Sequence, residues 1–256
     1  MIKNIGLIGY GMIGKYIFEG LSKEKEAEVG FVYHINKEAT SNLPQKLVYD
    51  SAEDLESYLQ KNHVDLVCET ATNQAASDLA PIILKYSDML IFSTCAFADQ
   101  DFMVMIEELC KKHNRKVYIP HGAILGLDGI RDGREKLQSV TVTTIKKPLN
   151  LGCDTNEKTI LFEGSTRMAC QKYPRYVNVH AGIALAGLGF DKTNSKIIAD
   201  PSIERNTHLI EIKADGVSFK LEIFNEPKGL ITGAYTPVSA LNTIKRIIEN
   251  NGLTII

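Results

Sequence analysis

Short apolar runs alternate with amphipathic stretches over the first 120 residues of the chain. We predict strands at residues 5–8, 29–33, 64–68, 89–93 and 116–119. We predict helices at residues 12–22, 52–61 (capped by Asp50 or Ser51), 74–86 and 99–113. Strands that alternate with helices of about ten to fifteen residues indicate βαβ units and a parallel sheet. Since these strands are apolar throughout, helices should cover both faces, as in a doubly wound α/β sheet.

The pattern changes after Pro120. Residues 139–146 alternate β-branched and polar side chains, which is typical of a half-exposed strand. We predict further strands at 195–199, 208–214 and 217–224, the last two joined at Gly216, and helices at 164–173, 177–187 and 237–250. We therefore expect a first domain over 1–120 and a second, mixed α+β domain over 121–232. The terminal segment 233–256 should pack back on the first domain.

Composition excludes several classes of protein. The 256 residues carry a net charge of −2, which gives no basic footprint for nucleic acid. No apolar run reaches the roughly eighteen residues that a membrane span needs. The first residues resemble a strand rather than a secretory signal, so we expect a cytoplasmic protein with reduced thiols. The five cysteines are scattered without metal-ligand spacing, so we expect no metal site.

A glycine motif supplies the clearest chemistry. Gly9, Gly11 and Gly14 form G-x-G-x-x-G directly after the first predicted strand, at the start of a helix. In a Rossmann domain the first glycine permits the tight turn, the second admits the pyrophosphate, and the third allows close helix–strand packing. The amides of the helix start, including Met12 and Ile13, would bind the phosphates. This context predicts that NAD or NADP binds here.

The second half of the dinucleotide motif is absent. A carboxylate normally follows the glycines by about twenty residues and holds the ribose 2′-hydroxyl, whereas residues 33–37 read Tyr-His-Ile-Asn-Lys. His34 or Asn36 could bind a hydroxyl, and His34 with Lys37 could meet a 2′-phosphate. The sequence therefore leaves the choice between NAD and NADP open.

Several polar segments of the second half lie where loops are expected. The glycine-rich residues 119–129 follow the last Rossmann strand and are placed either to touch a nicotinamide or to act as a hinge. Residues 145–148 (Ile-Lys-Lys-Pro) end a predicted strand and could either offer a cation to a carboxylate or place a lysine pair on the surface. Ser165 and Thr166 precede a predicted helix, whose first amides could hold an anion. His208 is a candidate for proton exchange near neutral pH.

These segments together resemble the L-aspartate dehydrogenase family, over nearly the whole chain. The stretches that carry the resemblance are 120–123 (PHGA), 126–128 (GLD), 147–148 (KP), 162–165 (FEGS), 173–179 (YPRYVNV), 185–189 (LAGLG), 199–201 (Ala-Asp-Pro) and 206–208 (Asn-Thr-His). The resemblance implies a Rossmann domain, an α/β catalytic domain and a homodimer. It implies that Ala123 and Asn178 contact the nicotinamide and that His208 is catalytic. The implied reaction is the reversible oxidation of L-aspartate to iminoaspartate and oxaloacetate, which could feed NAD synthesis.

For a substrate with two carboxylates we take Lys147 as the first candidate cation and the helix start at Ser165 and Thr166 as the second. His121 and Asn206 are further candidate substrate contacts. The sequence departs from the family pattern at His121, at Cys95, and in a C-terminal stretch that begins at Asn225 and Glu226. Two alternatives stay open: a related oxidoreductase acting on another amino or imino acid, and a non-catalytic nucleotide sensor.

Overall fold

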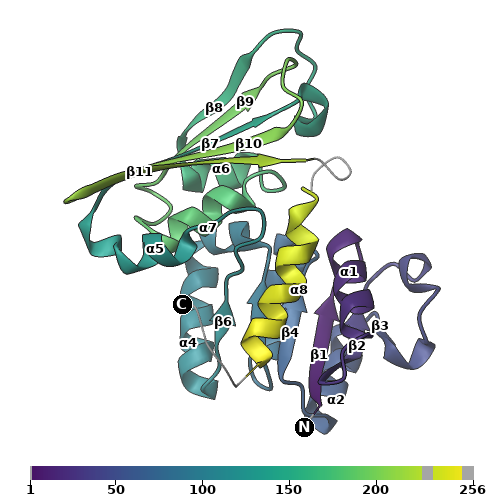
Figure 1. Cartoon of the computed structure of the whole chain (residues 1–256). Helices are drawn as coiled ribbons and strands as arrows, with labels where there is room; N and C mark the ends of the chain where they lie inside the picture. The colour runs from purple at the N-terminus through teal and green to yellow at the C-terminus, as the bar shows by residue number, and fades with distance from the viewer. Residues whose placement is uncertain (1, 227–232, 250–256) are drawn as a thin grey trace. The chain divides into compact units, whose positions relative to one another are not determined.

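The structure is a computed structural model, and it describes residues 2–226 and 233–249. Within these residues the chain divides into two compact units. The first unit runs to Pro120 and resumes at Pro237, and the second runs from His121 to Thr236. Both are drawn in Figure 1.

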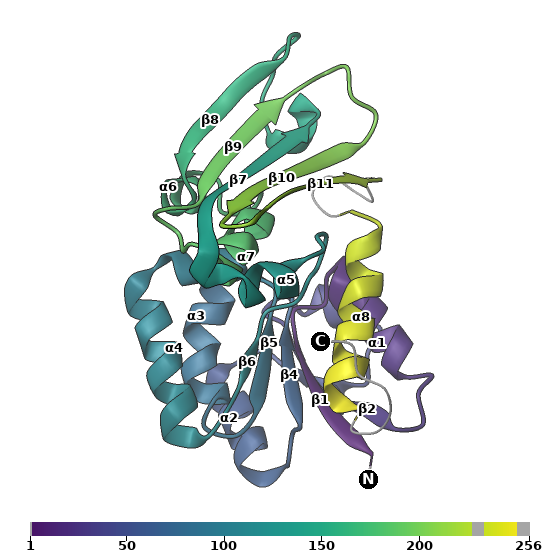
Figure 2. The same cartoon turned by 60° about the vertical axis from the view of Figure 1, so that its left-hand side comes forward.

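The first unit is a six-stranded parallel sheet between two layers of helices. Its strands are β1 (Lys3–Ile8), β2 (Ala27–Tyr33), β3 (Val48–Tyr49), β4 (Leu66–Glu69), β5 (Asp88–Ile91) and β6 (Val117–Tyr118), in the order β3-β2-β1-β4-β5-β6. Its helices are α1 (Met12–Leu21), α2 (Ala52–Lys61), α3 (Asn73–Ile83), α4 (Gln100–His113) and α8 (Tyr235–Ile248). Figure 2 shows α2, α3 and α4 on one face of the sheet, and α1 and α8 on the other. This strand order is that of the Rossmann fold, so the predicted doubly wound sheet is confirmed.

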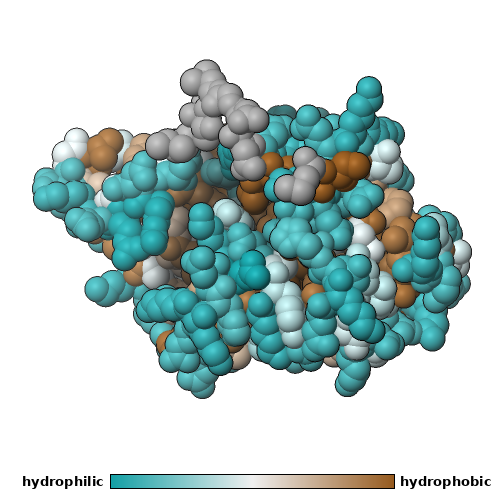
Figure 3. Space-filling model, turned by 90° about the horizontal axis from the view of Figure 1, so that it is seen from below, coloured by the Kyte–Doolittle hydropathy of each residue, from teal (hydrophilic) through white to brown (hydrophobic). Residues whose placement is uncertain are grey.

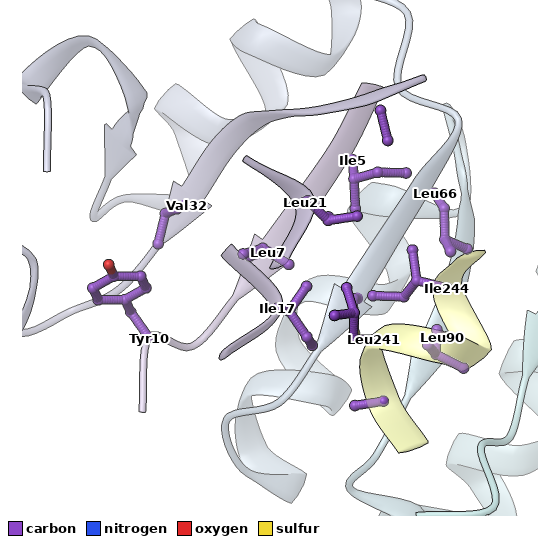
Figure 4. Packing of buried hydrophobic residues seen from close by; sticks show 13 residues of the cluster. Ile5, Leu7, Tyr10, Ile17, Leu21, Val32, Leu66, Leu90, Leu241 and Ile244 are labelled. Carbon is purple, nitrogen blue, oxygen red and sulfur yellow. The ribbon is translucent and has the colours of Figure 1, made fainter. Parts of the chain in front are cut away.

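The C-terminal helix α8 completes the core on the α1 face of the sheet (Figure 4). Leu241 and Ile244 of α8 pack with Ile17 of α1 and with Leu7 of β1 in one buried cluster. The Leu241 side chain lies where Gly20 of α1 leaves room for it. A helix far along the sequence thus belongs to the first unit, because its apolar face covers strands that would otherwise be exposed.

The second unit is built on a mixed five-stranded sheet. Its strands are β7 (Leu137–Lys146), β8 (Thr159–Ser165), β9 (Asn194–Ala199), β10 (Asn206–Ala214) and β11 (Val217–Asn225), in the order β11-β10-β7-β9-β8. Its helices are α5 (Leu127–Asp132), α6 (Thr166–Lys172) and α7 (Asn178–Ala186). Only β7 and β9 pair in parallel, and the other pairs are antiparallel. The hairpin between β10 and β11 turns at Gly216, which has a φ of +84°. The mixed sheet and its helices confirm the predicted α+β unit.

Two local predictions are wrong in this unit. The helix predicted over 164–173 begins only at Thr166, because residues 159–165 form the strand β8, which the sequence pattern does not predict. The expected loop over 119–129 already contains the start of α5 at Leu127. The sequence also gives no hint of β3, a strand of two residues that follows two short 3-10 turns.

The surface in Figure 3 is mostly hydrophilic, with hydrophobic residues in limited areas of the visible face. Within the described residues, no helix is long and apolar enough to cross a membrane.

Candidate functional site

The glycine motif of the first unit has three different local geometries. Gly9 has a φ of +91°, and a Cβ there would lie 2.9 Å from the Ala71 side chain, so the turn requires glycine. A Cβ on Gly14 would lie 2.2 Å from the Gly9 carbonyl oxygen, so Gly14 permits close packing of α1. A Cβ on Gly11 would meet no atom within 4 Å. Gly11 therefore faces open space, as a residue beside a bound pyrophosphate must.

The start of α1 fits the phosphates of a dinucleotide. The helix begins at Met12 after Gly11, and no side chain caps its first turn. The Met12 and Ile13 amides belong to that turn, where backbone N–H groups and the positive end of the helix dipole attract anions. The open space at Gly11 and the uncapped helix start together fit a dinucleotide, and when bound it would exchange a hydride with the substrate.

The segment after β2 is held by its own hydrogen bonds. The Asn36 amide donates to Nδ1 of His34 at 3.0 Å, so a neutral His34 carries its proton on Nε2 and can donate to a ribose hydroxyl oxygen. Lys37, by contrast, lies 2.8 Å from Asp50, and this ion pair raises the pKa of Lys37. His34 is therefore a better candidate than Lys37 for contact with the cofactor.

A buried carboxylate, which no sequence pattern indicated, joins two strand ends in the first unit. Glu69 ends β4 and is fully buried. It accepts hydrogen bonds from the Ala71 amide at 2.7 Å, the Ser93 amide at 3.0 Å and the Ser93 hydroxyl at 2.9 Å. Burial raises the pKa of Glu69 to about 6, and the hydrogen bonds from Ser93 and Ala71 oppose this rise. Glu69 thus fixes the carboxyl ends of β4 and β5, the edge of an open α/β sheet where ligands bind.

The second unit contains a buried centre of two histidines. His208 of β10 pairs with Thr144 of β7 across the antiparallel ladder. The Thr144 hydroxyl lies 2.9 Å from Nδ1 of His208 and 2.7 Å from Nε2 of His180, which α7 supplies. On the far side of the His180 ring, Nδ1 lies 2.9 Å from the hydroxyl of Ser195 on β9. One threonine thus joins the two rings, and all of these side chains are buried.

A third titratable group, Lys146, belongs to the same strand face. It lies two residues after Thr144, is 4% exposed, and has its ammonium 5.8 Å from the centre of the Tyr176 ring. Burial lowers the pKa of Lys146 to about 8. Burial, and then the charge of Lys146, lower the pKa of His208 to about 3. The pKa of His180 falls to about 3 through burial, His208 and Lys146. Both imidazoles are therefore neutral at neutral pH.

The structure shows how the expected substrate contacts lie, and it offers a buried alternative to one of them. Lys147 is exposed, whereas its neighbour Lys146 is the buried cation. The amides of Thr166, Arg167 and Met168 already donate to the Thr193 carbonyl, the Phe190 carbonyl and the Ser165 hydroxyl. The start of α6 therefore has no unused amide among these three for an anion. Thr166 is fully buried and belongs to the histidine centre instead.

The other candidates lie at the ends of elements in the second unit. His121 and Ala123 precede α5 in a loop tied to β11, since the Asn225 side-chain amide donates to the Ala123 carbonyl at 3.3 Å. Asn178 is the first residue of α7. Asn206 starts β10, is buried, and pairs with Asn225. The C-terminal stretch that departs from the family pattern continues through Pro227 to Leu230, outside the described residues.

The centre contains three residues that the sequence did not single out, Thr144, His180 and Ser195, and it contains Lys146, whose neighbour Lys147 we expected to be the carboxylate contact. The alternation in β7 contained a usable signal, because Val140, Val142, Thr144 and Lys146 share one strand face. His180 and Ser195 gave none, since a buried histidine or serine has no distinct sequence pattern. Among the described residues, no group of three His, Cys, Asp or Glu side chains is placed to hold a metal ion.

A dinucleotide site on a Rossmann sheet and a buried centre of neutral histidines define an NAD(P)-dependent oxidoreductase. Residues 9–120 match the family described as homoserine dehydrogenase, NAD binding domain, and residues 128–247 match aspartate dehydrogenase, C-terminal. The chain belongs to the L-aspartate dehydrogenase family.

Relatives of full length support this assignment. The chain is 35% identical to the L-aspartate dehydrogenase of Methanococcoides burtonii, with 96% of this chain and 97% of the relative covered. Its identity to the enzyme of Methanosarcina mazei is also 35%, with the same coverage. The crystal structure of aspartate dehydrogenase from Thermotoga maritima matches with a TM-score of 0.78 and 28% identity, covering 100% of this chain and 99% of that one.

Proposed function

We propose that this protein catalyses the reversible, NAD(P)-dependent oxidation of L-aspartate to iminoaspartate, which water converts to oxaloacetate and ammonia. The observation that carries the proposal is the buried centre of His208, Thr144 and Lys146 in a chain of this family. The reaction needs a group that takes a proton and a cation that binds carboxylates, and this centre contains both.

In this proposal His208 is the general base. Its Nδ1 faces Thr144 at 2.9 Å, and within the described residues we find no hydrogen bond at its Nε2. Nε2 can therefore accept a proton from the substrate ammonium, or from the water that attacks the imine. Lys146, two residues from Thr144 on the same strand face, is the cation that we assign to a substrate carboxylate.

The substrate would adjust the basicity of His208. Without substrate, burial and the positive charge of Lys146 keep the pKa of His208 low. A carboxylate bound at Lys146 would offset that charge, and a second carboxylate would add negative charge close to the ring. Both effects favour the imidazolium and raise the pKa of His208 toward the range in which a general base works.

The choice of dinucleotide rests on the segment after β2. The nicotinamide contacts and the oligomeric state rest on the family. Residues 33–37 contain no carboxylate to repel a 2′-phosphate, so we infer that both NAD and NADP bind. Ala123 and Asn178 would contact the nicotinamide, while Asn206 and His121 would border the substrate. We propose a cytoplasmic homodimer whose product, iminoaspartate, can supply NAD synthesis.

The test is the appearance of reduced nicotinamide absorbance when the protein meets L-aspartate, with NAD and NADP supplied separately. The variant His208→Asn keeps an N–H group toward Thr144 but has no basic nitrogen. We expect kcat to fall by about 10²- to 10⁴-fold, with unchanged affinity for the reduced cofactor.

Near-normal turnover in His208→Asn would remove His208 from the mechanism. Turnover on a different amino acid and none on aspartate would favour the related oxidoreductase, which is motivated by His121, Cys95 and the altered C-terminal stretch. Cofactor binding without turnover on any amino or keto acid would favour a nucleotide sensor.

A further inference from the structure

We propose that a buried hydrogen-bond chain from Thr166 through Ser195, His180 and Thr144 fixes the tautomer of His208, so that Nε2 is the basic nitrogen. The inference deepens the proposed function, on which the role of His208 rests. Thr166, Ser195, His180 and Thr144 are positioning residues, since they act on the reaction through His208.

The donor and acceptor roles along these hydrogen bonds are set at Thr166, the end farthest from His208. The Thr166 hydroxyl lies 3.0 Å from the carbonyl oxygen of Thr193, an atom that can only accept. A hydroxyl has one proton, so Thr166 gives it to that carbonyl. At its contact of 2.8 Å with the Ser195 hydroxyl, Thr166 must then accept. The proton of Ser195 is therefore used toward Thr166.

Ser195 determines which nitrogen of His180 carries the proton. Because its proton is committed, the Ser195 oxygen can only accept at its contact of 2.9 Å with Nδ1 of His180. Nδ1 of His180 must therefore carry a proton. A neutral imidazole with Nδ1 protonated has a lone pair on Nε2. His180 is neutral because it is fully buried beside His208 and Lys146, which lowers its pKa to about 3.

Thr144 completes the sequence. Its hydroxyl donates to Nε2 of His180 at 2.7 Å, so its oxygen accepts at the contact of 2.9 Å with Nδ1 of His208. Nδ1 of His208 thus carries the proton, and a neutral His208 has its lone pair on Nε2. Each of the four contacts fits only one direction once the carbonyl end is fixed.

The catalytic consequence is selection of one nitrogen. An imidazole that can bind its proton on either nitrogen offers its base in the right place for only part of the time. A catalytic histidine held in the wrong tautomer loses about 10⁴-fold in rate in the serine protease triad. Here the neutral hydroxyl of Thr144, rather than a carboxylate, selects the tautomer of His208. The hydrogen bonds from Thr166 to His180 determine toward which side that hydroxyl donates its proton.

The first measurement is a ¹⁵N–¹H correlation spectrum of the histidine rings in the protein without substrate. The two neutral tautomers differ in which ring nitrogen has the shift of a protonated nitrogen. The sequence has six histidines, so His208→Asn and His180→Gln assign the two signals by their loss. We expect His208 and His180 both with the proton on Nδ1. His208 protonated on Nε2 would overturn the proposal, whether or not the protein oxidises aspartate.

The second measurement uses matched variants of Thr144. Thr144→Val keeps the volume and removes the hydroxyl, whereas Thr144→Ser keeps the hydroxyl and removes the methyl group. If the chain acts as proposed, Thr144→Val lowers kcat at least about tenfold and alters the His208 tautomer, while Thr144→Ser keeps both. If Thr144 only fills space, Thr144→Ser is the more damaged variant, and that result would overturn the proposal.

Ser195→Ala tests the remote part, since Ser195 touches His180 and not His208. Without the Ser195 oxygen as acceptor, His180 can carry its proton on Nε2 instead of Nδ1. It would then donate to the Thr144 hydroxyl, which would donate in turn to Nδ1 of His208. His208 would then carry its proton on Nε2. We expect a lower kcat with an unchanged affinity for the reduced cofactor. A folded Ser195→Ala protein with His208 still protonated on Nδ1 and a normal kcat would show that the chain does not set the tautomer.

Discussion

Two adjacent lysines show how a single position decides the role of a residue. Successive side chains of a strand point to opposite faces, so Lys146 continues the buried face of Val142 and Thr144. Lys147 follows the end of β7 and is exposed. The two lysines are identical cations side by side in the sequence, and only the alternation of side chains along the strand distinguishes them.

This difference gives a prediction for substrate binding. Lys146→Gln should weaken the binding of succinate, a dicarboxylate without an amino group, by about tenfold or more, because a charged hydrogen bond contributes roughly 1.5–3 kcal/mol. Lys147→Gln, the matched control, should bind succinate nearly as well as the wild type. Competitive inhibition of aspartate oxidation measures both constants.

The same assay has a pH signature. Since burial lowers the pKa of Lys146 to about 8, the cation is present below pH 8 and is lost above it. Succinate inhibition should therefore weaken above about pH 8 in the wild type and in Lys147→Gln, and should be weak and flat in Lys146→Gln. Equal inhibition in both variants would exclude Lys146 as the carboxylate site.

Residues could be predicted where a local motif defines them. Gly9, Gly11 and Gly14 are recognisable because the spacing itself produces the turn and the helix start. The histidine centre could not be predicted in this way. Its members range from Thr144 to His208, and hydroxyls on buried strand faces look alike until the sheet register brings them together.

At the scale of elements, the start of α1 contains one glycine that we assign to cofactor binding, Gly11, and another that we assign to stability, Gly14. Gly11 faces open space, so Gly11→Val should fold with little change in melting temperature and lose affinity for the reduced cofactor, because its side chain would fill the phosphate position. Gly14→Ala places a methyl group 2.2 Å from the Gly9 carbonyl oxygen, so it should lower the melting temperature. Cofactor fluorescence and thermal unfolding of both variants measure the two effects separately.

The two glycines serve as controls for each other. Full cofactor affinity in Gly11→Val would contradict the assignment of the phosphate site. An unchanged melting temperature in Gly14→Ala would show that α1 can move away from the turn.

Elements were predictable where their pattern is long, and two of the four edge strands, β3 and β8, were missed. The four long helices of the first 120 residues follow apolar periodicity. Helix α2 begins at Ala52 as expected, and of its two candidate caps, Asp50 and Ser51, Ser51 is the one that caps it. β8 is an edge strand with Ile160 exposed and Phe162 buried, and it ends in Gly164 and Ser165, which look like a turn. Its partner β9 lies far along the chain, so no local pattern distinguishes this strand from a loop.

At the scale of the whole molecule, the two units contain buried titratable groups with opposite responses to acid. Glu69, in the first unit, has a pKa raised from 4.5 to about 6. A raised pKa contributes stability that is present below pH 4.5 and is lost as the pH rises through 6. For His180 and His208, in the second unit, the pKa falls from 6.5 to about 3. This contribution is present above pH 6.5 and is lost as the pH falls toward 3.

The magnitudes decide which unit opens first in acid. Acidification from pH 7 to 4.5 should let Glu69 add about 2 kcal/mol to the first unit, at about 1.4 kcal/mol per pH unit of pKa shift. Over the same range the coupled pair of His180 and His208, whose pKa shifts are larger and of opposite sign, should destabilise the second unit. Exposed ion pairs such as Lys136 with Asp215 contribute little by comparison. We therefore expect the second unit to open before the first.

Hydrogen exchange of the whole protein at pH 7 and at pH 4.5, corrected for the intrinsic effect of pH on exchange, tests this order. Protection should fall in β7, β10 and α7 while β1 and β4 keep theirs, because protonating either imidazole places a charge in a buried site. Glu69→Gln should remove the acid-induced gain in the first unit and leave the response of the second unchanged. Simultaneous loss of protection in β1 and β10 would mean that the histidine centre does not control the response to acid, and that the two units unfold as one.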